Sequence, residues 1–258
     1  MLRRRGPETG VTSQDSKRRE GELAGQTVVV IGGSAGIGYE TGRRARAEGA
    51  DVILTARNPD RLGQAARELG AKDSAAFDAT DLNRLGRFFD ELPGPIDHVL
   101  VTGPGPYYAP LAELDFEKAH HDLDAHLFLP LQVARHAPAK VRAGGTLLFM
   151  GGTGGRRPGN PFISALTATG PAVTKSLALE LAPVRVNLIA AGFVDTPLSA
   201  SLLGDQLDAR HEQLRTALPI RRVVGPADIA RLAIDIMTNT ALTGATFDID
   251  GGQQLVEG

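Results

Sequence analysis

VVVIGGSAGIG, at residues 28–38, is the stretch that decides how the rest of the chain is interpreted. Four apolar, mostly β-branched residues lead into a glycine-rich turn, and residues 36–48 have the pattern of a helix. Glycine lets backbone N–H groups approach a phosphate closely, and the N-terminus of a helix attracts anions. The stretch predicts a dinucleotide phosphate site made by Gly32, Ser34, Gly36, Ile37 and Gly38. An ordinary tight turn between a strand and a helix is the alternative.

Length and composition are those of a globular α/β protein. The chain has 258 residues, 42% of them hydrophobic, a formal net charge of -2 and no cysteine. This length is enough for one large domain, and the balanced charge gives no reason to expect binding to nucleic acid or to an anionic membrane. The absence of cysteine excludes disulfides and thiolate metal sites, which fits a cytoplasmic protein. We expect no nucleic-acid partner, no membrane association and no metal site.

Residues 1–22 are polar and contain two basic clusters, at 3–5 and 17–19. No apolar run in this leader is long enough for a signal sequence or a membrane span. We interpret residues 1–22 as a disordered leader, with a basic interaction arm as the alternative. Residues 23–258 are assigned to a single domain.

Strands and helices alternate along that domain. Apolar runs predict strands at 27–31, 51–55, 75–77, 96–102, 145–150, 184–189 and 246–249. Helical spacing predicts helices at 36–48, 59–69, 81–92, 113–142, 162–181 and 227–237, the fifth of them bent at Gly170 and Pro171 because proline lacks an N–H donor. About seven strands alternating with helices predict an α/β fold with a doubly wound parallel sheet of the Rossmann type.

The ends of the second and third predicted strands indicate the nucleotide. Arg57 follows the second strand, where a guanidinium suits the 2′-phosphate of NADP(H) and a carboxylate would suit NAD(H). Asp78 follows the third strand, where it can accept a hydrogen bond from an adenine amino group. A solvated arginine and a helix-capping aspartate are the alternatives. The predicted cofactor is NADP(H), with NAD(H) as the second choice.

Further motifs follow the glycine turn in a fixed order. They are FDATD at 77–81, SLALEL at 176–181, RVN at 185–187, GFVDT at 192–196 and DGG at 250–252. With these motifs, residues 25–252 resemble the short-chain dehydrogenase/reductase family. The resemblance implies a single Rossmann-type domain, an NAD(P) cofactor and a homo-oligomer, either a dimer or a tetramer.

The resemblance also implies roles for single residues around the cofactor. It places Gly32, Gly36 and Gly38 at the pyrophosphate, Arg57 at the 2′-phosphate and Asp78 at the adenine. Gly192 and Thr196 match the segment that meets the nicotinamide carboxamide and the phosphates. Gly103 lies in TGPG at 102–105, which stands where the family has Asn-Asn-Ala-Gly.

The catalytic half of the family pattern is missing. In the family, a serine after the fifth strand polarises the substrate, and a Tyr-x-x-x-Lys pair on the next helix handles the proton. Counted back from residues 176–181, the tyrosine position falls on Ile163 and the lysine position on Thr167, while the serine position falls on Gly152. None of these three residues can perform the family's role.

Tyr107, Tyr108 and Thr153 are the predicted catalytic replacements. Both tyrosines follow the fourth strand, beside the expected nicotinamide pocket, where a phenol can donate a proton or a hydrogen bond. Thr153 follows the fifth strand and can donate a hydrogen bond in place of the serine. Aromatic pocket walls, and a loop hydroxyl bonded to its own backbone, are the respective alternatives.

Three histidines on one predicted helix suggest a metal site, but their spacing argues against it. His120 and His121 are adjacent and His126 is five residues further, whereas a helical metal pair needs a spacing of three or four. Asp122 and His126 are four residues apart, so they can form an acid/base pair. A charge pair on the surface of a helix is the alternative.

The predicted function is an NADP(H)-dependent oxidoreductase with an atypical active site, acting on a small carbonyl, enone or alcohol. Leucines within residues 197–222 resemble the substrate-covering lid of the family, and they suit an apolar small-molecule substrate. The alternatives are a dinucleotide-binding pseudoenzyme with a regulatory or structural role, and a non-redox use of the same scaffold.

Overall fold

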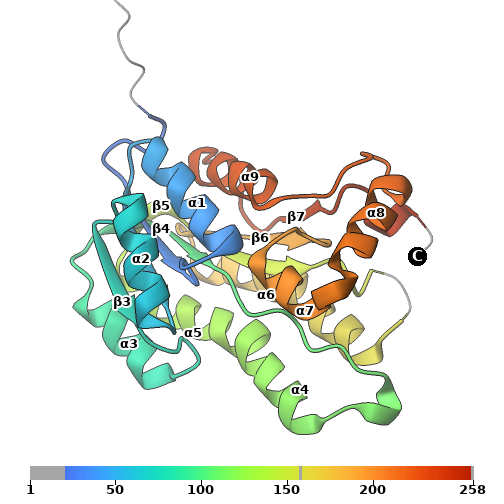
Figure 1. Ribbon diagram of the computed structural model, residues 1–258. Coiled ribbons are helices and arrows are strands. Elements are labelled where there is room, and N and C mark those ends of the chain that lie inside the picture. The colour runs from blue at the N-terminus through green and yellow to red at the C-terminus, as the bar shows by residue number, and fades with distance from the viewer. Residues whose placement is uncertain (1–20, 157–158, 257–258) are drawn as a thin grey trace, which may run out of the picture.

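A parallel sheet of seven strands forms the centre of the computed structural model (Figure 1). The structure describes residues 21–156 and 159–256, so residues 1–20 of the predicted leader lie outside the described residues. The strand order is β3-β2-β1-β4-β5-β6-β7, and every pair of neighbours is parallel. The predicted doubly wound sheet is therefore confirmed.

The bounds of the elements are as follows. The strands are β1 (Thr27–Ile31), β2 (Asp51–Ala56), β3 (Asp73–Ala76), β4 (Ile96–Val101), β5 (Val141–Gly152), β6 (Arg185–Ala191) and β7 (Thr246–Ile249). The α-helices are α1 (Gly36–Ala47), α2 (Pro59–Leu69), α3 (Leu82–Glu91), α4 (Phe116–Leu123), α5 (Leu129–His136), α6 (Pro161–Glu180), α7 (Pro197–Leu203), α8 (Leu207–Ala217) and α9 (Pro226–Thr238). A π-helical turn, η2 (Asp124–Phe128), joins α4 to α5.

Helices cover both faces of the sheet, which is why its central strands are largely apolar. All six residues of β4 are buried, including the polar Asp97 and His98. One core cluster joins the sheet to α1, α2 and α9, and the other joins it to α3, α5 and α6. Within residues 21–156 and 159–256, no helix is both long and apolar enough to cross a membrane.

The long helix expected at residues 113–142 is confirmed in part. Helical backbone runs from Phe116 to Ala139 through α4, the turn η2, α5 and a 3-10 turn, and β5 begins at Val141. Pro130 has no N–H to donate to the carbonyl of His126, so one hydrogen bond of a regular α-helix is missing at this point. A π-helical turn takes its place, as is common where a helix carries a functional residue.

α6 runs without interruption through Gly170 and Pro171, where the sequence predicts a bend. A Cβ on Gly170 would lie 2.9 Å from Leu188 Cδ2, so glycine at this position lets α6 pack closely on β6. The packing of the helix on the sheet outweighs the local cost of the proline.

The order in which the chain adds strands to the sheet reverses between β1 and β4. The connections that leave these two strands therefore lead to opposite sides of the sheet. In doubly wound folds, the crevice at the carboxyl ends of the strands at such a switch point is the ligand site. The turn at 32–38 and the segment after β4 both begin there, and α7 and α8 lie over it (Figure 1).

Candidate active site

The glycine turn is built so that only glycine fits. Gly32 has φ +88°, and a Cβ there would lie 2.2 Å from Thr102 Oγ1. A Cβ on Gly38 would lie 2.3 Å from the carbonyl oxygen of Gly32. The backbone N–H groups of Gly32 and Gly33 both donate to the carbonyl of Thr55, at 3.0 and 2.8 Å, which ties the turn to the end of β2.

The N-terminus of α1 suits a phosphate. Ala35 occupies the N-cap position and provides no side-chain cap, and the first turn holds no acidic residue. The first N–H groups of a helix need an external acceptor when no side chain supplies one. These N–H donors lie next to the glycine turn, where a Cβ would obstruct the backbone. They fit the pyrophosphate of a dinucleotide.

Arg57 and Asp78 lie near each other at the ends of β2 and β3. One carboxylate oxygen of Asp78 accepts hydrogen bonds from the amide and the hydroxyl of Thr80, at 3.0 and 2.8 Å. Burial alone raises the pKa of the Asp78 carboxyl, but the Thr80 hydrogen bonds and the charge of Arg57 outweigh it and lower that pKa. An ionised acceptor and a guanidinium therefore occupy the end of the crevice where the sequence predicts the adenosine.

The loop after β6 meets the glycine turn. A Cβ on Gly36 would lie 3.6 Å from the side chain of Thr196, so the two predicted cofactor residues face each other. The Thr196 hydroxyl also caps α7 by accepting from the amide of Ser199 at 3.2 Å. Gln253, which the sequence did not suggest, accepts from the amide of Phe193 at 2.8 Å and so holds the C-terminal segment against this loop.

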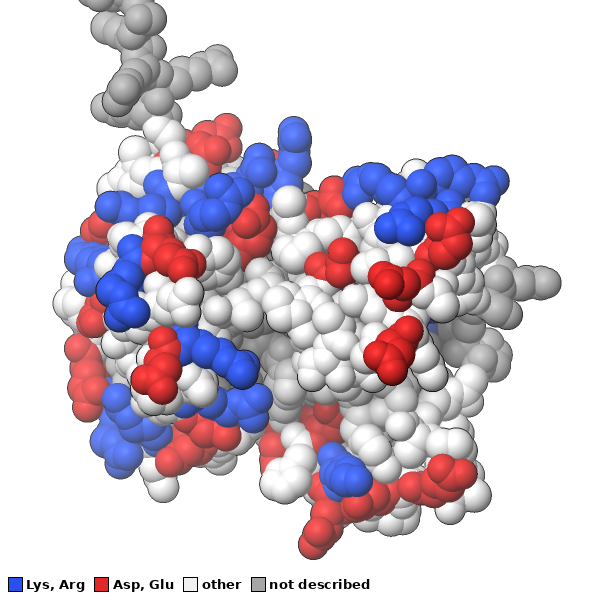
Figure 2. All heavy atoms as spheres, in the orientation of Figure 1, with Lys and Arg blue, Asp and Glu red and all other residues white. Residues whose placement is uncertain are grey.

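A cavity of about 1310 Å³ opens from this point between the ends of β4, β5 and β6 and the helices α4, α6, α7 and α8. Figure 2 shows the hollow, with mostly uncharged side chains around it. Ile37 and Gly103 line it on the cofactor side, while Leu198, Leu202 and Leu214 line it on the side of the lid. The predicted apolar lid residues therefore do face the crevice.

The positions to which the sequence assigns the family's tyrosine, lysine and serine contain no group that can transfer a proton. Ile163 is 2% exposed and belongs to the core, and the Thr167 hydroxyl donates to the Ile163 carbonyl at 2.8 Å. Gly152 is the last residue of β5. Thr167 and Gly152 line the cavity. The space that the larger reactive side chains of the family would fill at these positions is therefore part of the cavity.

The structure separates the two tyrosines. The Tyr107 hydroxyl accepts from the amide of Asp115 at 3.1 Å and faces the carbonyl of Glu113 at 3.5 Å, so it supports the turn before α4. The Tyr108 hydroxyl lies 3.6 Å from where a Cβ on Gly154 would stand, and Ile163 Cγ2 lies 3.3 Å from the same point. Tyr108 therefore reaches from the other side of the cavity toward the family's tyrosine position.

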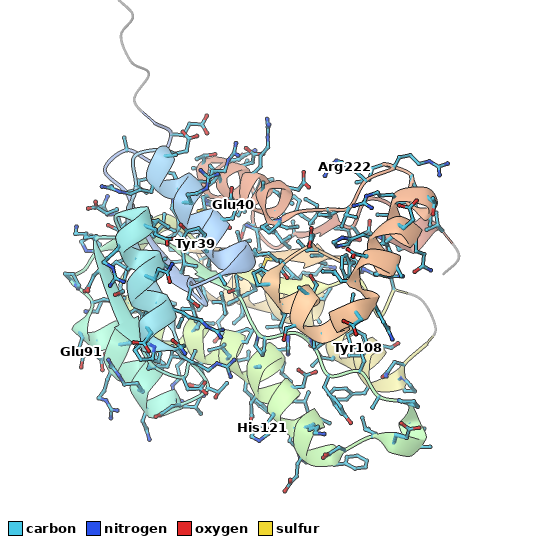
Figure 3. All side chains as sticks on the ribbon, viewed as in Figure 1. Tyr39, Glu40, Glu91, Tyr108, His121 and Arg222 are labelled. Carbon is cyan, nitrogen blue, oxygen red and sulfur yellow. The ribbon has the colours of Figure 1, made fainter. Side chains whose placement is uncertain are left out.

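Figure 3 shows Tyr108 on the segment that runs between α4 and α7. Although 62% of this residue is exposed, burial of its hydroxyl and the negative charge of Asp122 raise the pKa of Tyr108. Its phenol is thus a hydrogen-bond donor at neutral pH and a weak acid. Thr153 is 7% exposed, lines the same cavity and donates its amide to the Ala191 carbonyl at 3.0 Å.

Comparison with known proteins identifies the family. Residues 32–254 match the family model described as enoyl-(acyl carrier protein) reductase. The short-chain dehydrogenase/reductase ATR9 of Stachybotrys chlorohalonatus is 28% identical over 89% of this chain and 97% of its own length. The chain belongs to the short-chain dehydrogenase/reductase family.

Two further members of the short-chain dehydrogenase/reductase family show its range of activities. The NADP-dependent (R)-specific alcohol dehydrogenase of Lentilactobacillus kefiri is 29% identical over 89% of this chain and 97% of its own length. The solved structure of the MalC reductase/Diels-Alderase of Malbranchea aurantiaca has a TM-score of 0.84 and 25% identity, covering 92% of this chain and 99% of its own.

Proposed function

We propose that this protein is an NADP(H)-dependent oxidoreductase that acts on a small apolar carbonyl, enone or alcohol through an atypical active site. The observation that carries the proposal is the continuity of the site. A glycine turn with an uncapped helix N-terminus opens directly into a cavity of about 1310 Å³. A dinucleotide and an apolar substrate can therefore lie end to end in one crevice.

The proposed cofactor residues divide into three groups. The pyrophosphate is held by the turn and the start of α1, through Gly32, Ser34, Gly36, Ile37 and Gly38. Arg57 and Asp78 hold the adenosine end, and Gly103, Gly192 and Thr196 hold the nicotinamide end. The NADP-dependent relative supports the choice of NADP(H), which the guanidinium of Arg57 would recognise through the 2′-phosphate.

The bound nicotinamide would supply a hydride to the substrate. The residues of this chain then orient the substrate and exclude water. Tyr108 and Thr153 can donate hydrogen bonds to the substrate oxygen from opposite walls of the cavity. Leu198 and Leu202, which are 43% and 62% exposed, provide apolar surface over the substrate.

Binding and turnover together test this proposal. NADPH and NADH are titrated against the protein, and NADPH oxidation is then followed with acetophenone, 1-phenyl-1,2-propanedione and 2-cyclohexenone. We expect NADPH to bind at least ten times more tightly than NADH and at least one compound to be reduced. Binding of NADPH without oxidation by any apolar carbonyl or enone would contradict the oxidoreductase; failure to bind either dinucleotide would contradict the site itself.

A non-redox use of the scaffold is the second candidate. The name of MalC joins a reductase to a Diels-Alderase on the same fold, and in this chain the space beside Thr167 and Gly152 is part of the cavity. Such a cavity can bind and preorganise an apolar substrate without a proton donor. A dinucleotide-binding pseudoenzyme would show NADPH binding and no turnover of either kind.

The setting of the protein follows from the same reasoning. We propose that it acts in the cytoplasm as a homo-oligomer, either a dimer or a tetramer, with residues 23–258 as its single domain. Light scattering of the full chain measures the oligomer directly. A monomer at micromolar concentration would exclude it.

A further inference from the structure

Asp122 and His126 form a second reactive pair in the wall of the cavity. Asp122 lies near the end of α4 and is 5% exposed, while the side chain of His126 lies in η2 and is 17% exposed. Both residues line the cavity, and a Cβ on Gly103 would lie 3.5 Å from His126 Nε2. The pair therefore stands beside the segment after β4 to which the nicotinamide end of the site is assigned.

Three oxygen atoms lie within hydrogen-bond distance of the two imidazole nitrogens, and all three are acceptors when Asp122 is ionised. Nδ1 lies 3.0 Å from a carboxylate oxygen of Asp122 and 3.0 Å from the Asp122 carbonyl. Nε2 lies 3.1 Å from the Pro104 carbonyl. Neutral histidine carries one N–H, whereas this site has acceptors at both nitrogens, so the geometry favours an imidazolium with two N–H groups.

The electrostatics agree with the geometry. Burial lowers the pKa of His126, but the hydrogen bonds and the negative charge of Asp122, together with the Pro104 carbonyl, outweigh burial and raise that pKa above its ordinary value. The other carboxylate oxygen of Asp122 accepts from the amide of Tyr107 at 2.8 Å, which fixes the carboxylate in place.

Other charged groups near the pair are few. The elements packed against η2 are α4, α5 and α6. On α4, Lys118 is paired with Asp115 at 3.6 Å and His121 is exposed. Among the described residues, those of α5 and α6 that line the cavity carry no charge. Asp122 is therefore the acidic partner that sets the charge of His126.

We propose that His126 is the proton donor of the reaction and that Asp122 positions it and keeps it charged. This inference rests on the proposed oxidoreductase function. An acid works best when its pKa lies near the working pH, which suits an imidazolium, whereas the phenol of Tyr108 is too weak an acid at neutral pH. Tyr108 then holds the substrate oxygen, and His126 protonates it.

The step balances on the substrate. The hydride from NADPH adds to the carbonyl carbon, and the π electron pair moves to the oxygen. That oxygen would take the proton from Nε2 of His126, which breaks the hydrogen bond from Nε2–H to the Pro104 carbonyl, so that an alcohol forms, NADPH becomes NADP⁺ and His126 becomes neutral. The Nδ1–H group remains hydrogen-bonded to Asp122. The deprotonated Nε2 faces the lone pairs of the Pro104 carbonyl, which favours its reprotonation by water.

Nuclear magnetic resonance tests the charge of His126 without any substrate. Protein carrying ¹³Cε1-labelled histidine is titrated between pH 5 and 9, and His126→Gln identifies the resonance. We expect His126 to titrate above about 6.5, the ordinary value, with Asp122→Asn lowering its midpoint. His120→Gln, an exposed position on the same helix, should leave that midpoint unchanged. A wild-type midpoint at or below the ordinary value overturns the proposal.

Single-turnover kinetics test the role in proton transfer. The compound reduced fastest by the wild type is mixed with preformed NADPH complexes of the wild type, His126→Gln and Asp122→Asn. We expect His126→Gln to lower the rate by about 10²–10³-fold while changing the NADPH Kd by less than about twofold. Asp122→Asn should move the midpoint of the pH–rate profile to lower pH, as it moves the resonance.

The outcomes are distinguishable. A His126→Gln rate within about twofold of an active wild type overturns the proton donor and leaves the oxidoreductase standing. A wild type that reduces no compound overturns both. If His126→Gln fails to bind NADPH, His126→Asn is measured in its place with the same criteria.

Discussion

The two halves of the crevice differ in the side chains that they offer for chemistry. On the side of β1, β2 and β3, the glycine turn, Arg57 and Asp78 offer groups that suit a dinucleotide. On the side of β5 and α6, the positions to which the sequence assigns the family's serine, tyrosine and lysine hold Gly152, Ile163 and Thr167. The backbone of a doubly wound sheet does not depend on the side chains that perform chemistry on it. The cofactor residues and the catalytic residues of such a fold can therefore change independently of each other.

The largest expected effect is on the cofactor half. Gly38→Ala places a Cβ 2.3 Å from the Gly32 carbonyl, so the turn must shift. We expect NADPH binding to fall by at least 100-fold and the free energy of unfolding to fall by about 3 kcal/mol. Isothermal titration and urea unfolding measure the two quantities. Gly63→Ala, within α2, is the control and should change neither by much, since the atom nearest to its added Cβ would be the flexible end of Arg67 at 3.4 Å.

We expect the nucleotide preference to depend on the guanidinium of Arg57. Arg57→Ala should weaken NADPH binding by about 30-fold, equivalent to about 2 kcal/mol, because charge-assisted hydrogen bonds to a phosphate are lost. NADH binding should hardly change. Arg61→Ala, one turn into α2, is the matched control. An unchanged ratio of the two dissociation constants in Arg57→Ala would assign the 2′-phosphate to another residue.

A tyrosine at position 163, where the sequence places the tyrosine of the family, should not increase carbonyl reduction. Ile163 is 2% exposed, so Ile163→Tyr forces a larger ring and a hydroxyl into a packed site. We expect the free energy of unfolding to fall by about 1–3 kcal/mol, without a gain in carbonyl reduction. Thr167→Lys faces the cavity and should be tolerated. A large gain in activity from Ile163→Tyr would show that the missing tyrosine alone limits this half.

The smallest expected effect is a pH-dependent contribution to stability. The folded-state pKa of His126 is raised, so the pair with Asp122 stabilises the fold below the unfolded-state value of about 6.5. That contribution is lost as the pH rises through the folded-state pKa. The loss of unfolding free energy in His126→Gln should therefore be larger at pH 5.5 than at pH 9 in urea titrations. An equal loss at both pH values would mean that the ring acts only by packing.

Local features of this protein could be read along the sequence. The glycine turn, the caps and the alternation of strands and helices depend on neighbouring residues, since positive φ angles and side-chain periodicity are local properties. The assignment of the family's tyrosine and lysine positions to Ile163 and Thr167 is a prediction from counting along α6. The helix expected at 113–142 contains a π-helical turn before Pro130, whereas α6 continues through Pro171, so the sequence did not show which proline would interrupt a regular helix.

The replacement chemistry was decided by the tertiary structure. His126 meets Pro104, 22 residues earlier, and the Tyr108 hydroxyl reaches the wall at Gly154 beside Ile163. These contacts exist because the order of parallel strands brings the ends of β4, β5 and β6 to one edge, and sequence periodicity carries no record of that order. The sequence alone thus predicted the nucleotide turn and the absence of the family's catalytic pair. Only the tertiary structure decided which other side chains line the cavity at the predicted positions of that pair.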